Sequence, residues 1–303
     1  MEHRPAADLS ALETLPRMPG WTRGVRGGTL EEAAFQSGAV LALVHQAVGR
    51  SDVPQPLWRA RLALGAAGAC VALAGRPERA AELRDAVHLL RPGDRPGPAG
   101  EVLMRWTHAV MRPVSGFDLG AGLVGGGLAG GALAGGAVGS PVARAAAVLE
   151  AMLIQAPQDE TAALILGDAV LARALGWGYV MPLLAVGLTP RDLRRKGEGL
   201  RLACHRSLAT SGRAAVQMAA ELALRAGRLR AVAPRLRAKG AAAAVALFET
   251  RDALTPVDLM GPMSGPMSGP MSGRAARRLC DRLVALGAVR ELTGRDSFRL
   301  YGV

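Results

Sequence analysis

Arginine side chains near the C-terminus are the residues whose type and spacing most clearly predict a chemistry, the binding of phosphate groups. Arg274, Arg277 and Arg278 lie on one side of a segment from Gly273 to Leu286, and Arg282 flanks its apolar stripe. That stripe has apolar residues recurring at the spacing of one helix face, at Ala275, Ala276, Leu279, Leu283 and Leu286. Guanidinium groups bind phosphate and the edges of guanine bases. The pattern therefore predicts a DNA-reading helix.

The residues on either side of this segment favour a capped helix followed by a β-hairpin. Ser272 is a favourable N-cap, and we also count it among the expected DNA contacts. Gly287 is expected to end the helix. Two strands, Val289–Leu292 and Ser297–Tyr301, are expected next, joined by a four-residue turn. The side chains expected to contact DNA from this hairpin are Arg295, at its tip, and Arg299, whereas those expected to face the core are Phe298 and Leu300.

The order of elements from Ala241 onward is typical of a winged helix-turn-helix. A first helix is expected over Ala241–Glu249, and a very short second helix over Thr255–Leu259. The tetrapeptide Gly-Pro-Met-Ser then occurs three times, at 261, 265 and 269, and lengthens the turn before the arginine-bearing helix. We predict a winged helix-turn-helix domain over 241–303, with a repeat loop over 261–272.

The charge of the chain is concentrated in its C-terminal third. Residues 1–190 contain 16 basic and 16 acidic side chains, whereas residues 191–303 contain 21 basic and 9 acidic ones, a net charge of +12. A concentrated positive field attracts polyanions, and nucleic acid is the commonest such partner of a basic domain. A membrane surface is the weaker alternative, and winged helices also serve as protein-binding modules.

The rest of the sequence predicts a loose N-terminal arm over 1–28 and an all-helical domain over 29–240. Low aromatic content and abundant Ala and Leu favour packed helices. A glycine-rich, low-complexity segment over 119–139 is not expected to span a membrane, because too few of its residues are strongly apolar. The helices are expected at Leu30–Val48, Leu57–Leu73, Pro77–Leu90, Glu101–Met111, Val142–Gln155, Glu160–Leu175 and, after a break near Gly197 and Gly199, about Ala203 to Ala231.

No catalytic, metal-binding or cofactor-binding pattern is evident. The sequence lacks a P-loop and the HExxH, GxSxG and paired-cysteine motifs, so no enzyme activity, metal or cofactor is expected. Cys204 and His205 are adjacent and point about 100° apart on a helix, which makes them poor joint ligands. The cysteines are predicted to be buried, reduced thiols of a cytoplasmic protein, since no export signal begins the chain. They are Cys70, Cys204 and Cys280.

Three stretches of the sequence resemble an uncharacterised bacterial family, the domain of unknown function 1403. They are Leu90–Gly100, Pro234–Gly240 and Arg274–Gly302, and the resemblance extends from about Phe35 to the C-terminus. It implies no activity. The last stretch is also similar to winged helices appended to Fic-type proteins, although the Fic catalytic motif is absent. The glycine-rich run and the Gly-Pro-Met-Ser repeats depart from the family pattern.

The sequence as a whole predicts a mainly α-helical protein with a C-terminal winged helix carrying a short β-hairpin. Its expected function is to bind double-stranded DNA in a regulatory role, with the helical domain sensing a signal or forming a homodimer. The alternatives are a non-catalytic helical scaffold that binds proteins through its wing and, third, an enzyme without a recognisable motif.

Overall fold

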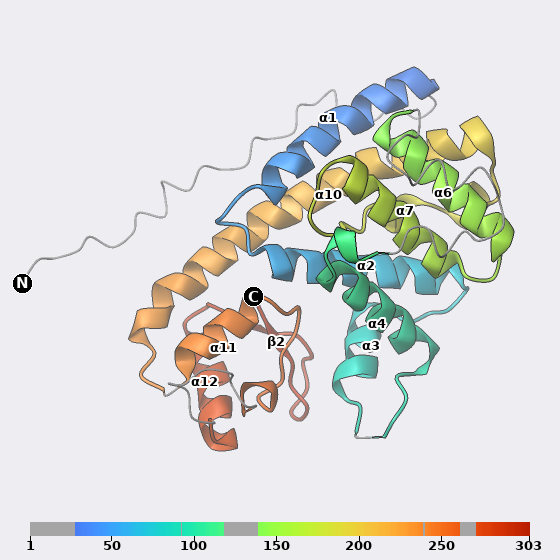
Figure 1. Cartoon of the computed structure of the whole chain (residues 1–303). Helices are drawn as coiled ribbons and strands as arrows, with labels where there is room; N and C mark the ends of the chain where they lie inside the picture. The colour runs from blue at the N-terminus through green and yellow to red at the C-terminus, as the bar shows by residue number, and fades with distance from the viewer. Residues whose placement is uncertain (1–27, 92, 118–138, 239, 261–270) are drawn as a thin grey trace, which may run out of the picture. The chain divides into compact units, whose positions relative to one another are not determined.

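The structure, a computed structural model, describes residues 28–91, 93–117, 139–238, 240–260 and 271–303. Helices make up most of these residues, and one two-stranded sheet lies near the C-terminus (Figure 1). The predicted mainly α-helical class is therefore confirmed. The predicted arm over 1–28, the glycine-rich segment over 119–139 and the repeat loop over 261–272 lie outside the described residues, except for their last one or two positions.

The chain divides into two compact units. The first, called here the helical unit, includes residues 28–49 and 59–216, and the second, called the C-terminal unit, includes residues 50–58 and 217–303. Two helices contribute residues to both units, α2 and α10. Gly240, where we predicted the domain boundary, has a left-handed backbone with φ of +84° and is the N-cap of α11.

The helical unit is built from helices joined by short connections. Its elements are α1 (Leu30–Val48), α2 (Gln55–Leu73), α3 (Ala80–His88), α4 (Gly97–Met111), the 3-10 turn η3 (Val114–Gly116), α6 (Pro141–Gln155), α7 (Glu160–Ala174), the single turns α8 (Leu184–Gly187) and α9 (Pro190–Leu193), and α10 (Gly197–Val232). Helices α6 and α7 pack side by side as a helical hairpin (Figure 1).

Side-chain caps fix the starts of several of these helices. Thr29 and Glu32 form a capping box at α1, with the Thr29 hydroxyl accepting from the Glu32 amide at 3.3 Å. Ser140 caps α6, where Pro141 occupies the first turn, and the Asp159 carboxylate accepts from the Ala162 amide at 3.0 Å at the start of α7. These local signals explain why the predicted and observed starts of the three helices agree within one residue.

Helix α10 differs from the prediction. We expected a break near Gly197 and Gly199, but one helix of 36 residues runs from Gly197 to Val232. Gly197 has a φ of +53°, so the left-handed backbone expected at a helix end occurs only at the first residue, and Gly199 continues the helix. Burial of Leu200, Leu208 and other side chains along α10 outweighs the modest helix propensity of Gly199.

A buried carboxyl group holds together the centre of the helical unit. Asp168 on α7 is fully buried and accepts hydrogen bonds from the backbone amides of Leu183 and Leu184, at 3.2 and 3.1 Å. From α10, the Ser207 hydroxyl donates to the Leu184 carbonyl at 2.9 Å. Burial raises the pKa of Asp168 to about 8, although the amide hydrogen bonds act in the opposite direction. The segment that leads into α8 is thus attached by polar bonds to two helices.

The C-terminal unit combines the end of α10 with a small helix and strand cluster. Its further elements are the 3-10 turn η5 (Ala233–Arg235), α11 (Ala241–Phe248), the 3-10 turn η6 (Asp258–Met260), α12 (Gly273–Ala285), β1 (Arg290–Glu291) and β2 (Tyr301–Gly302). An ion pair between Arg230 and Glu249, at 2.6 Å, links the last turn of α10 to the end of α11. Phe248, Leu259 and Leu283 are fully buried in its core.

The three cysteines, Cys70, Cys204 and Cys280, are buried free thiols, as predicted. Burial raises the pKa of Cys204 and of Cys280 to about 12, which disfavours the reactive thiolate. Among helices of the described residues, none has the length together with the apolar character needed to cross a bilayer.

Candidate nucleic-acid interface

The arginine-bearing segment predicted from the sequence is a helix, α12, with one buried and one exposed side. The Ser272 hydroxyl caps it by accepting from the Ala275 amide at 3.3 Å. Gly287, with a φ of +66°, follows its end, as expected of a left-handed C-terminal residue. The buried side chains of α12 are Ala276, Leu279, Cys280 and Leu283. Of the predicted apolar stripe, Ala275 and Leu286 are only half-buried.

The predicted arginines all lie on the exposed side of α12. Arg274, Arg277, Arg278 and Arg282 are exposed, and in the described part of the chain none of their guanidinium groups pairs with a carboxylate. Asp281 is exposed on the same side, three and four residues from Arg278 and Arg277. The surface of α12 therefore carries four positive charges and one negative charge.

A short antiparallel ladder follows α12. Strand β1 pairs with β2 in a register that places Arg290 opposite Gly302 and Glu291 opposite Tyr301. Leu254, between α11 and η6, pairs with the other edge of Tyr301 through two backbone hydrogen bonds of 2.9 and 2.8 Å. Tyr301 is thus the centre of a three-segment ladder that the sequence analysis described only as a hairpin.

The turn between β1 and β2 is held by one carboxylate. Glu291 accepts from the amides of Thr293 and Gly294, at 2.7 and 2.9 Å, and from the Thr293 hydroxyl. Burial alone would raise the pKa of Glu291, but these hydrogen bonds and the positive charge of Arg299 outweigh it and lower the pKa. Arg295 and Arg299 are both exposed on this turn, and the Arg299 guanidinium donates to the Arg295 carbonyl at 2.9 Å.

Comparison with models of protein families identifies the family of this chain. A sequence model described as protein of unknown function (DUF1403) matches residues 6–303. The chain belongs to the DUF1403 family. Among curated proteins and among solved structures, no match is found for this DUF1403 chain.

Three features of this DUF1403 chain correct the expectations for its C-terminal segment. The strands are shorter than the predicted Val289–Leu292 and Ser297–Tyr301. Phe298 is 71% exposed instead of facing the core, because its φ of +55° interrupts the alternation of an extended strand, whereas Leu300 is buried as expected. The predicted second helix is only a 3-10 turn, which begins at Asp258 after mutual capping of Thr255 and Asp258.

The predicted arginine positions therefore fall into two groups in the DUF1403 chain, four on α12 and two on the turn after β1. Sequence reasoning missed Arg290, which is exposed on β1, and the pairing of Leu254 with Tyr301. The alternation around Arg290 could have identified this arginine. The pairing of Leu254 with Tyr301 could not be predicted, because these residues are 47 positions apart. Within the described residues, no group of three or more His, Cys, Asp or Glu side chains is placed to hold a metal ion.

Proposed function

We propose that the C-terminal unit of this DUF1403 protein is a winged helix-turn-helix that binds double-stranded DNA, in a regulatory role in the cytoplasm. The observation that carries the proposal is the exposed, unpaired set of arginines on α12. An arginine with no carboxylate partner retains its full charge for phosphate, and its planar group forms bidentate bonds.

The dimensions of α12 and the neighbouring ladder support a groove-binding geometry. A helix of 13 residues is about 20 Å long, and the major groove of B-DNA, about 12 Å wide, admits one helix. The arginines at 274, 278 and 282 recur every four residues, so they follow one line along the helix. The order α11, Leu254, η6, α12, β1 and β2 matches the order of a winged helix, in which the turn after β1 would contact the backbone or minor groove.

The charge of the C-terminal unit also favours a polyanionic partner. Residues 50–58 and 217–303 contain 15 basic and 8 acidic side chains, a formal charge of +7. Asp281 is the acidic exception on the DNA-binding side of α12. A carboxylate there can accept a hydrogen bond from the amino group of cytosine, and it repels phosphate where no cytosine lies opposite.

We expect the full-length protein to bind DNA duplexes of mixed sequence with an affinity that depends strongly on salt concentration. Neutralisation of four phosphates gives a log-log slope of association constant against salt of about −3.6. The triple variant Arg274→Ala, Arg277→Ala, Arg278→Ala leaves one of these contacts, so its slope should be about −0.9. Relative to a common affinity at 1 M salt, its binding at 0.1 M salt should be weaker by roughly 100- to 1,000-fold. Fluorescence anisotropy of labelled duplexes from 50 to 250 mM salt measures both quantities.

A matched control variant removes three positive charges from the helical unit. Arg191, Arg194 and Lys196 are exposed in the helical unit, and their triple alanine variant should bind with the wild-type slope. If both triple variants lose equal affinity, binding reflects net charge and the assignment to α12 is wrong. If the wild-type protein does not bind duplex DNA at low salt, the proposal fails and protein partners become the next class to examine.

A further inference from the structure

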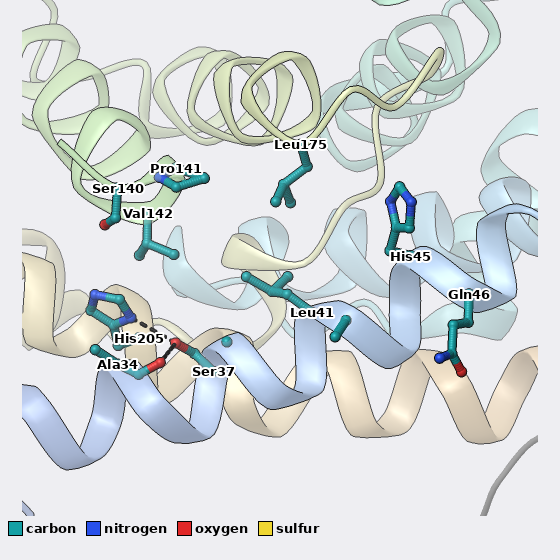
Figure 2. Close-up of a pocket in the computed structure, with 12 residues that line it drawn as sticks. Ala34, Ser37, Leu41, His45, Gln46, Ser140, Pro141, Val142, Leu175 and His205 are labelled. Atoms are coloured by element: carbon teal, nitrogen blue, oxygen red, sulfur yellow. Dashed lines mark hydrogen bonds between the residues drawn. The ribbon is translucent and has the colours of Figure 1, made fainter. Parts of the chain in front are cut away.

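A pocket in the helical unit has the size and lining of a small-molecule site. It has a volume of about 550 Å³ and is lined by residues of α1, the start of α6, the end of α7 and α10 (Figure 2). This volume lies within the range of about 300–1,000 Å³ typical of ligand pockets. The apolar part of the lining includes Leu41, Pro141, Val142 and Leu175.

The pocket contains no charged side chain. Its twelve lining residues include no Asp, Glu, Lys or Arg, and its polar groups belong to Ser37, His45, Gln46, Ser140 and His205. An ionic ligand would find no counter-charge among these side chains, and contact with the apolar lining would cost it part of its hydration. The lining therefore favours an uncharged molecule.

His205 presents a hydrogen-bond acceptor to this pocket. The Ser37 hydroxyl is 3.0 Å from the Ala34 carbonyl and 2.7 Å from Nδ1 of His205, and both side chains are buried. The carbonyl can only accept, so the single hydroxyl hydrogen is donated to it, and Nδ1 must carry the hydrogen of the second bond. Burial, with a smaller contribution from Arg201, lowers the pKa of His205 to about 4. The neutral ring then has an acceptor lone pair on Nε2, which has no partner among the described residues.

His45, in contrast, presents a hydrogen-bond donor to the pocket. Its Nδ1 accepts from the indole N–H of Trp177 at 3.0 Å, and an indole nitrogen can only donate. Because Nδ1 accepts this bond, it carries no hydrogen, and the ring hydrogen of His45 is on Nε2, which is a donor. Figure 2 shows His205 and His45 on opposite sides of the pocket, with Leu41 and Leu175 between them.

We propose that this pocket binds an uncharged, largely apolar small molecule whose hydrogen-bond donor meets His205 and whose acceptor meets His45. The proposal does not depend on DNA binding by the C-terminal unit, because every lining residue belongs to the helical unit.

The charge preference can be tested with two fluorescent probes that share one ring framework. N-phenyl-1-naphthylamine is neutral and carries one N–H donor, whereas 1-anilinonaphthalene-8-sulfonate adds a negative charge. We expect the neutral probe to bind the full-length protein saturably at one site, and the sulfonate to bind at least tenfold more weakly. Equal affinities, or no saturable binding of the neutral probe, would overturn the proposal.

The location is tested by filling the pocket from α1. Gly38 lines the pocket and a Cβ atom there meets no heavy atom within 4 Å, so Gly38→Leu adds apolar bulk to the lining with no clash at Cβ. The control is Gly65→Leu on α2, where a Cβ atom also meets open space away from the pocket. We expect Gly38→Leu to weaken binding of the neutral probe at least tenfold and Gly65→Leu to leave it unchanged. Wild-type binding by Gly38→Leu, with its helical circular dichroism unchanged, would show that the probe binds elsewhere and would refute the assignment.

Discussion

The Asp168→Leu variant is expected to lose about 2–6 kcal/mol of unfolding free energy. Leucine is similar in size but leaves the amides of Leu183 and Leu184 buried without an acceptor, at a cost of about 1–3 kcal/mol each. Chemical denaturation followed by far-ultraviolet circular dichroism measures the loss. A variant as stable as the wild type would show that these amides find other acceptors and that Asp168 does not anchor the segment before α8.

The Asp168→Asn variant is the matched control, and it also tests the protonation state. Asparagine keeps an oxygen that can accept from both amides, so we expect it to retain most of the wild-type stability at pH 7. Since the folded-state pKa of about 8 is above the unfolded value of 3.8, the folded protein binds one more proton between these values. This group's contribution to wild-type stability is therefore complete below pH 3.8 and falls as the pH rises toward 8, by at most about 1.4 kcal/mol per pH unit.

Asparagine does not titrate, so the stability difference between the two proteins should change steadily from pH 5 to pH 8. Because other titrating groups are common to both proteins, they largely cancel in this difference. A constant difference over this range would mean that the carboxyl group is ionised in the folded protein throughout and that burial does not control its pKa.

The sequence predicted the elements whose signals are local. Helix α1 was predicted to the residue from its apolar periodicity and the glycine that follows Val48, and the structure adds a capping box of Thr29 and Glu32 at its start. The exposed and buried sides of α12 were also predictable, since a helix of 13 residues repeats its pattern several times. The same periodicity predicted that Arg274, Arg277 and Arg278 share the exposed side, with Arg282 beside the apolar stripe.

What the sequence did not predict depends on residues that are distant along the chain. Ser37 and His205 are 168 positions apart, so neither could be recognised as part of a pocket. Leu254 has no strand pattern of its own and is extended because Tyr301 pairs with it. The positive φ of Phe298 is equally invisible to an alternating pattern, which placed this side chain in the core.

Helix α10 contains a further glycine, Gly212, whose role depends on a residue far away in the sequence. A glycine within a helix is expected to destabilise it, by about 1 kcal/mol relative to alanine. At Gly212, however, a Cβ atom would lie only 2.5 Å from Cγ1 of the buried Val40 on α1. The absence of a side chain allows α1 and α10 to approach closely within the helical unit.

A double-mutant cycle between these two residues should reveal this close contact. We expect Gly212→Ala to destabilise the protein by about 1–3 kcal/mol through overpacking, because the branched Val40 side chain has few alternative rotamers on a helix. Val40→Ala should cost about 2–3 kcal/mol by leaving a cavity.

The added methyl group at 212 occupies part of the space vacated at 40, so the double variant should be more stable than the sum of the single losses predicts, by about 1–2 kcal/mol. Gly65→Ala is the control for the helix propensity of alanine. A Cβ atom there meets nothing within 4 Å, and the substitution should be neutral or stabilise α2 by up to about 1 kcal/mol. If Gly212→Ala behaves like Gly65→Ala and the cycle shows no coupling, α1 and α10 are not in close contact at Gly212, and the helix must tolerate this glycine for another reason.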